Sequence, residues 1–88
     1  MRLDWDAAKA RANARKHGVT FVEASTAFDD PLGAYYPDAL YPTRFVLVGA
    51  SSKARVFYVV YAEVTLDHIR IISARKATSH ERARYETD

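Results

Sequence analysis

Two segments dense in β-branched and aromatic residues, separated by a short polar turn, constrain the fold of this chain most strongly. Residues 45–49 and 56–61 each have the composition of a buried strand. The polar residues 51–54 between them favour a turn, so the two strands should pair as an antiparallel hairpin. A third segment of the same kind covers residues 69–75, after a second expected turn over residues 63–67. The second half of the chain therefore predicts an antiparallel sheet.

Both ends of the chain carry helical signals. Asp4 or Asp6 can cap a helix that runs to about His17, and Gly18 suits the left-handed position that closes such a helix. Two capping-box spacings predict the start of a short second helix and of a final helix that runs to about Glu86; they are Thr20 with Glu23 and Thr78 with Glu81.

These elements predict an α+β fold in which helices pack on one face of a curved antiparallel β-sheet. We expect three to four strands, two N-terminal helices and one C-terminal helix. Residues 32–36 and a short segment before the first helix are open candidates for additional strands. With 88 residues, the chain has room for one domain, residues 1–88.

The composition excludes several classes of protein. There are no cysteines, which removes disulfides, thiolate metal sites and cysteine nucleophiles. No run of about 18 apolar residues could span a membrane. Residues 1–6 lack the apolar core of a signal peptide. We therefore expect a soluble, cytoplasmic protein that makes no membrane contact.

The sequence gives no sign of a metal or cofactor site. His17, His68 and His80 lack the spacing of zinc ligands, and the acidic pair before Pro31 is typical of a turn. The three glycines lie far apart and form no phosphate-binding loop. We therefore expect no metal ion and no cofactor.

Positive charge is concentrated at the two ends of the chain. Residues 1–17 carry five cations and two anions, residues 18–69 carry three and six, and residues 70–88 carry five and three. If the two ends meet in the fold, they form one basic surface suited to an anionic partner. The alternative is that each end is a solvated helix surface.

Two arginines lie in the last predicted strand. Arg70 lies between Ile69 and Ile71, so it should face away from both. Arg75 falls on the same face as these two isoleucines unless a bulge intervenes. In a regular strand the two arginines would therefore not converge.

Motifs in three parts of the chain occur in the same order as in a known family. They are Trp5-Asp6-x-x-Lys9-x-x-x-Asn13-x-x-Lys16-His17-Gly18-Val19-x-Phe21, then Phe28-Asp29-Asp30-Pro31, then Arg70-Ile71-Ile72-Ser73-Ala74-Arg75-x-Ala77-Thr78 followed by Glu81-Arg82 and Tyr85. Together they resemble the BrnT toxins of bacterial type II toxin–antitoxin modules over nearly the whole chain.

The resemblance implies a RelE-like fold and a metal-independent endoribonuclease that cleaves RNA and inhibits translation. It also implies neutralisation by a BrnA-type ribbon-helix-helix antitoxin, with operator DNA contacted only through that antitoxin. The alternative function is a non-catalytic interaction module that binds a DNA-binding antitoxin and co-represses its operon. Residues 32–41, which contain three tyrosines and two leucines, are the candidate docking arm.

Metal-free cleavage of RNA needs proton transfer and stabilisation of phosphate charge. Lysine and histidine can transfer protons and arginine matches phosphate geometry, so the candidate catalytic residues are Lys16, His17, Arg70 and Arg75. Aromatic rings can stack on bases and further arginines can contact phosphates, so the candidate RNA-binding residues are Trp5, Arg44, Arg55, Arg82 and Tyr85.

Four of these candidates have a structural alternative. Trp5 can belong to the core, and Lys16 and His17 can complement the dipole at the end of the first helix. Arg82 can pair with Glu86 one turn further along the final helix.

Overall fold

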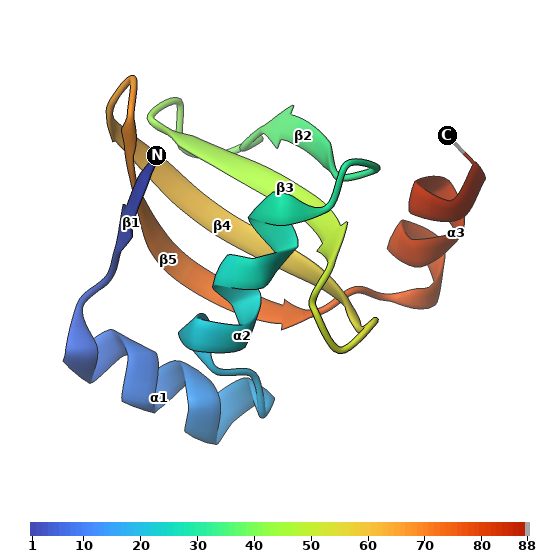
Figure 1. Cartoon of the computed structure of the whole chain (residues 1–88), viewed down its shortest axis with the longest axis horizontal. Coiled ribbons are helices and arrows are strands. Elements are labelled where there is room, and N and C mark those ends of the chain that lie inside the picture. The colour runs from blue at the N-terminus through green and yellow to red at the C-terminus, as the bar shows by residue number, and fades with distance from the viewer. Residues whose placement is uncertain (88) are drawn as a thin grey trace.

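The computed structural model describes residues 1–87. Figure 1 shows a curved sheet with the two N-terminal helices (blue and teal) below it and in front of it, and the C-terminal helix (red) to its right. In chain order the elements are β1 (Arg2–Asp4), α1 (Ala7–His17), α2 (Phe21–Thr26), a 3₁₀ turn η1 (Ala27–Asp29), β2 (Ala34–Pro37), β3 (Arg44–Ala50), β4 (Val56–Thr65), β5 (His68–Lys76) and α3 (Ser79–Thr87).

The sheet has five strands in the order β1-β5-β4-β3-β2. Strands β2 to β5 are antiparallel, and the predicted hairpin is present, with Ala50 of β3 opposite Val56 of β4. The expectation of three to four strands in a wholly antiparallel sheet is wrong, because β1 pairs in parallel with residues 68–70 of β5. Strand β1 is three residues long, too short to show an alternating pattern, and its partner lies more than 60 residues away in sequence.

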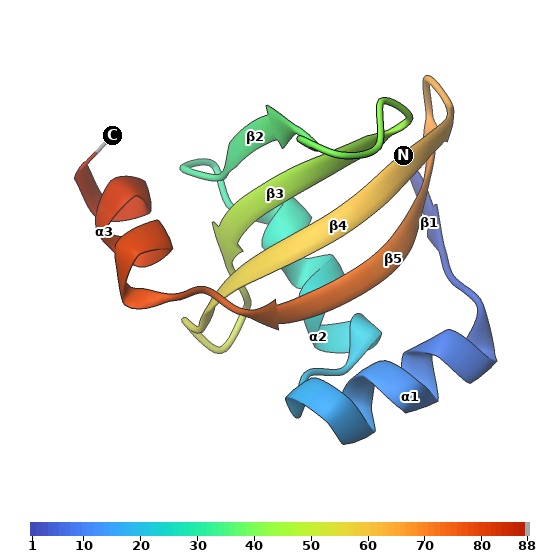
Figure 2. The same cartoon turned by 180° about the vertical axis from the view of Figure 1, so that it is seen from behind.

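One face of the sheet carries the core. Helix α2 crosses this face, in front of the sheet in Figure 1 and behind it in Figure 2. Phe21 of α2 packs among side chains that project toward it from the strands. The largest fully buried side chains of the strands are Leu47, Phe57, Val59 and Ile71. We call the opposite face the outer face.

The expectation that the helices share one face is also wrong, because α3 lies against the outer face. His80, Glu81 and Arg84 of α3 line a groove together with Val46 and Val48 of β3. Because α3 buries no residue, its sequence has no clear apolar stripe. The sequence therefore could not indicate which face of the sheet this helix covers.

The helix ends follow the predicted signals. The Asp6 side chain accepts a hydrogen bond from the Lys9 N–H at 2.9 Å, and Gly18 closes α1 with a φ of 68°. The Thr20 hydroxyl accepts from the N–H at the third position of α2 at 3.1 Å. Thr78 begins α3 through both bonds of a capping box, at 3.1 and 2.9 Å.

The side-chain amide of Asn13 joins α1 to the edge of β5. Its Nδ2 donates to the carbonyl oxygens of Val19 at 3.0 Å and Ala74 at 2.8 Å, and its Oδ1 accepts from the Ala74 N–H at 3.1 Å. Asn13 is the one buried residue of α1. Because β1 covers β5 only at residues 68–70, the amide supplies the partners that Ala74 lacks at this edge.

Replacing Asn13 with alanine should lower the free energy of unfolding by about 3 kcal/mol, because three buried hydrogen bonds are lost and backbone groups are left without partners. Urea unfolding followed by circular dichroism measures this. Arg11→Ala on the exposed side of α1 is the control, with an expected change below about 0.5 kcal/mol. A similar change in both variants would contradict the role given to Asn13.

Candidate functional site

A bulge in β5 decides where its two arginines point. Val60 of β4 pairs with Ser73, whereas the next residue, Tyr61, pairs with Ile71, so Ile72 is the extra residue of a β-bulge. After the bulge the alternation of faces is reversed.

Both arginines consequently lie on the outer face. Ile71 and Ala74 are both buried in the core although they are three residues apart. Arg70 and Arg75 therefore share the outer face, opposite Ala62 and Tyr58 of β4, about 13 Å apart along the strand. The expectation for a regular strand, in which the two arginines would lie on opposite faces, is corrected by the bulge, whose position no local sequence signal indicates.

Arg70 is held by a carboxylate from β1. Its Nε donates to Asp4 Oδ1 at 2.9 Å, and the ring of His68 lies 2.7 Å from Asp4 Oδ2. The hydrogen bond from Arg70 is the main cause that lowers the pKa of Asp4 to about 2, and His68 lowers it further. The Asp4 carboxylate therefore orients the guanidinium of Arg70 and the imidazole of His68 side by side.

A groove of about 450 Å³ opens beside Arg70. It is lined by Asp4, Trp5, Asp6, Lys9 and Arg70, and we call it the Arg70 groove. It brings together the predicted residues Arg70 and Trp5. Lys9 belongs to the family motif but was not a predicted site residue. It lies seven residues before Lys16, which places both lysines on one flank of the helix, and this spacing is the signal that could have identified it.

The cations of α1 are divided between two flanks of the helix. Lys9 lines the Arg70 groove, and Lys16 lies two turns further along the same flank. Arg11 lines a separate apolar hollow with Thr20 and Val22, so Arg11 and Arg15 occupy the other flank.

Helix α1 runs alongside β5 in the same direction. Lys9 lines the same groove as Arg70 near the start of both elements, and Asn13 is hydrogen-bonded to Ala74 further along. Lys16, which is exposed, and His17, which is half-buried, therefore lie toward the end of β5 that carries Arg75. We call Lys9, Lys16, Arg70 and Arg75 the cationic strip.

Arg75 connects the strip to α3. Its guanidinium lies over the ring of Tyr58 at 4.0 Å from the centroid. Its two terminal nitrogens donate to both carboxylate oxygens of Glu81, at 2.8 and 3.0 Å. This bidentate pair is the main cause that lowers the pKa of Glu81.

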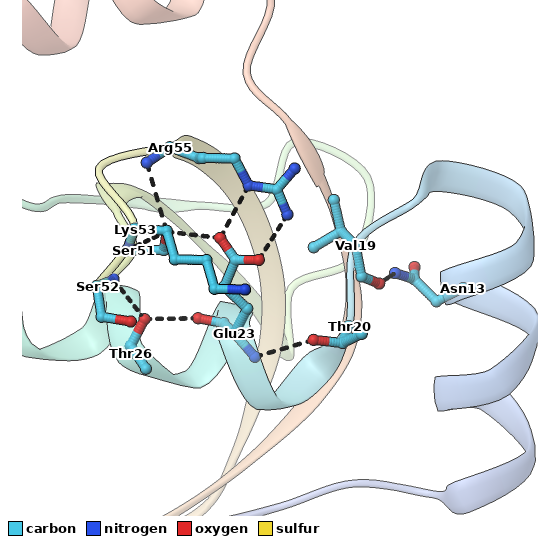
Figure 3. A network of polar contacts seen from close by, with 9 residues as sticks. All are labelled: Asn13, Val19, Thr20, Glu23, Thr26, Ser51, Ser52, Lys53 and Arg55. Carbon is cyan, nitrogen blue, oxygen red and sulfur yellow. Dashed lines mark hydrogen bonds and ion pairs between the residues drawn. The ribbon is translucent and has the colours of Figure 1, made fainter.

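Arg55 is engaged in a polar network away from the strip (Figure 3). Its Nε donates to Glu23 Oε2 at 2.9 Å, and its Nη2 donates to Glu23 Oε1. The Ser51 hydroxyl donates to the same carboxylate at 2.7 Å. Glu23 is buried, and the hydrogen bonds from Arg55 are the main cause that lowers its pKa to about 2. The network fastens α2 to the β3–β4 turn.

The other predicted RNA-binding residues are scattered. Trp5 packs edge-to-face on Phe21 at 6.0 Å between centroids, so its ring belongs partly to the core. The Tyr85 hydroxyl donates to Asp30 at 2.5 Å, which raises the pKa of Tyr85 to about 12.

Two predicted arginines are exposed to different degrees near the sheet. Arg44 is half-buried, with its guanidinium over the ring of Tyr41 at 4.4 Å. Arg82 is exposed and lines a hollow with Arg55, Lys76 and Glu86, but within residues 1–87 it forms no ion pair with Glu86.

Among residues 1–87, no three His, Asp or Glu side chains are grouped closely enough to hold a metal ion. In the same part of the chain, no helix has the length and apolar character needed to cross a membrane.

The structure defines a small α+β protein with a five-stranded sheet and a cationic strip that runs along α1 and β5. The sequence model of the ribonuclease toxin BrnT of type II toxin–antitoxin systems matches residues 5–81, and the chain belongs to this family, as its motifs predicted. The crystal structure of the Brucella abortus ribonuclease toxin BrnT has a similar fold, with a TM-score of 0.73 at 22% identity, covering 90% of this chain and 99% of that chain. No curated protein matches the chain.

The depressed pKa of Glu23 predicts an acid-sensitive contribution to stability. The pKa of Glu23 is about 2 in the folded chain and 4.5 when unperturbed, so the stabilisation is complete above pH 4.5 and disappears as the pH falls toward 2. Glu23→Gln should therefore lower stability at pH 7 and show a smaller further loss between these two pH values than the wild type. Urea unfolding at pH 7, 4 and 3 measures both effects.

Glu63→Gln is the control, since Glu63 is exposed on β4. It should keep the acid dependence of the wild type. A wild-type slope in Glu23→Gln would show that another carboxylate carries this dependence.

Proposed function

We propose that this chain is a metal-independent endoribonuclease, the toxin of a type II module whose antitoxin holds it inactive. Membership of the BrnT family supports this assignment. The observation that carries the site is the bulge at Ile72, since it puts Arg70 and Arg75 on one face, beside the Lys9 and Lys16 flank of α1. In this proposal the RNA backbone lies along the cationic strip, and cleavage of cellular RNA inhibits translation.

Cleavage without a metal can use the 2′-hydroxyl of RNA as nucleophile. The protein must then accept the 2′ proton, donate a proton to the leaving 5′ oxygen, and stabilise the charge on the phosphate. Arg70 and Arg75 are suited to binding the phosphate, because one guanidinium group can donate two parallel hydrogen bonds to two phosphate oxygens. Lys16 and His17, at the end of α1, are assigned the proton transfers.

The roles of the remaining predicted residues depend on whether another protein side chain already binds their polar groups. Trp5 offers the edge of its ring to a base at the Arg70 groove, and Arg44 and Arg82 are assigned to phosphates outside the strip. Arg55 and Tyr85 are assigned structural roles, because Glu23 and Asp30 already bind them.

The strip is tested by a pair of neighbouring residues on opposite flanks of α1. Lys16→Ala should lower the rate of RNA cleavage at least about 100-fold, because a proton-transfer group is lost. Arg15→Ala should stay within about twofold, since it removes only a screened surface charge from the other flank. Cleavage of a labelled RNA under single-turnover conditions with EDTA present measures both.

Arg70→Ala should lower the rate about 100-fold or more, as expected for a lost phosphate contact. Its folding is checked by thermal unfolding, because Arg70 also binds Asp4. Full activity in both Lys16→Ala and Arg70→Ala would refute the assignment of the strip.

The alternative, a non-catalytic interaction module, is supported by a second surface. Large apolar side chains are exposed around the edge strand β2, and the exposed fraction reaches 71% at Leu32 and 81% at Leu40. Tyr35 and Tyr41 are exposed in the same region. Such a patch is typical of a protein-binding site. We assign it to a BrnA-type ribbon-helix-helix antitoxin, through which the complex would contact operator DNA.

Growth separates the two functions. Induced expression of the chain should arrest growth, and co-expression of the neighbouring antitoxin gene should restore it. A Leu32→Ser, Leu40→Ser double variant should still arrest growth but should lose most of this rescue, together with co-purification of the antitoxin. Verified soluble expression without arrest would favour the non-catalytic module.

A further inference from the structure

The outer face has a second groove, of about 340 Å³, between α3 and the sheet. We call it the α3 groove. Val46 and Val48 form part of its lining and are nearly fully buried. The other lining residues are two tyrosines, two small apolar residues and three polar residues of α3: Tyr36, Tyr58, Pro37, Ala39, His80, Glu81 and Arg84. The groove thus combines an apolar base with tyrosines and cations.

Arginine and tyrosine side chains are stacked in pairs at this groove. The Arg84 guanidinium lies over the ring of Tyr36 at 5.4 Å, and that of Arg75 lies over Tyr58 at 4.0 Å. A third pair, Arg44 over Tyr41, lies on the loop and strand next to it. Planar aromatic and guanidinium groups are the surfaces on which unpaired RNA bases stack.

The α3 groove also meets the cationic strip. Tyr58 lines the groove while its ring supports Arg75, which belongs to the strip. The charge of Glu81, the carboxylate in the lining, is matched by Arg75. Arg84 and His80 form no ion pair among the described residues, so they are available to a ligand, as are the hydroxyls of Tyr36 and Tyr58.

We propose that the α3 groove binds a nucleobase of single-stranded RNA, from a nucleotide next to the phosphate held on the cationic strip. The proposal rests on the proposed function, and it adds a site for base recognition. The base stacks on the Tyr36 and Arg84 pair above Val46 and Val48. Arg84 and His80 supply hydrogen bonds to its edge, so this groove determines which base is preferred beside the cleaved bond.

The experiment compares two neighbouring tyrosines of β2 that face opposite sides of the sheet. Tyr36→Leu removes the aromatic face from the groove, Tyr36→Phe keeps it, and Tyr35→Leu is the matched control on the core side, where Tyr35 contacts Tyr61. The probe is a short single-stranded RNA with 2′-O-methyl groups, which blocks the nucleophile, so binding is measured without cleavage. Fluorescence anisotropy at several salt concentrations gives the dissociation constant.

Tyr36→Leu should bind about tenfold more weakly than the wild type, which is the loss expected for one stacked base. Tyr36→Phe and Tyr35→Leu should bind like the wild type. The slope of log K against log salt should not change in Tyr36→Leu, because no phosphate contact is lost. In Lys16→Ala the slope should fall by about 0.7, as for one phosphate of a single strand. In a series of probes that each lack a different base, the probe without the stacked base should bind Tyr36→Leu and the wild type equally, because it has no base to place on Tyr36.

Wild-type affinity in Tyr36→Leu, combined with weaker binding in Lys16→Ala, would overturn the nucleobase site and leave the proposed function standing. Wild-type affinity in both would count against both proposals. If Tyr36→Leu instead weakened only the capture of the antitoxin, the groove would belong to that protein partner and the nucleobase proposal would fail.

Discussion

The hydrogen bonds of one buried amide fix the position of the first helix relative to the sheet. Strand β5 lies between β4 and β1, but β1 pairs only with its first three residues. The backbone groups along the rest of that edge of β5 therefore need other hydrogen-bond partners. Asn13 supplies them at Ala74 and also binds Val19, where the chain leaves α1. An unpaired buried amide or carbonyl would cost free energy here, so α1 is held along β5 in one register.

The charges of the outer face divide into two kinds. Arg70 and Arg75 are each bound by a carboxylate, Asp4 and Glu81, so their side chains are oriented but their charge is largely matched. Lys9 and Lys16 form no ion pair within residues 1–87. The lysines therefore supply most of the attraction for a polyanion, while the arginines supply geometry. A phosphate at either arginine must compete with its carboxylate, which favours a ligand that binds both arginines at once.

Local signals predicted the parts of the fold that depend on neighbouring residues. The Asp6, Thr20 and Thr78 caps depend on residues three positions apart, the β3–β4 hairpin depends on two strands joined by one short turn, and all are present. The same holds for the family motifs, whose match to BrnT is confirmed.

The errors arise where distant residues decide. The parallel pairing of β1, the bulge at Ile72 and the placement of α3 on the outer face depend on residues brought together only by folding. For the candidate site, the sequence singled out the arginines of β5 but could not indicate Asp4 as the partner of Arg70, because the two residues are 66 positions apart. Arg55 was indistinguishable from a free arginine until the fold brought Glu23 to it.

Helix α3 is attached to the rest of the chain almost entirely by polar contacts. It has no buried residue, and its links are the Arg75–Glu81 ion pair, the hydrogen bond from Tyr85 to Asp30, and the stacking of Arg84 on Tyr36. Contacts of this kind contribute less than a buried apolar face, so α3 is the element expected to detach first by local unfolding, with its amide hydrogens exchanging well before those of β4. Glu81 both caps the helix and binds Arg75, so detachment of α3 would release that arginine at the same moment.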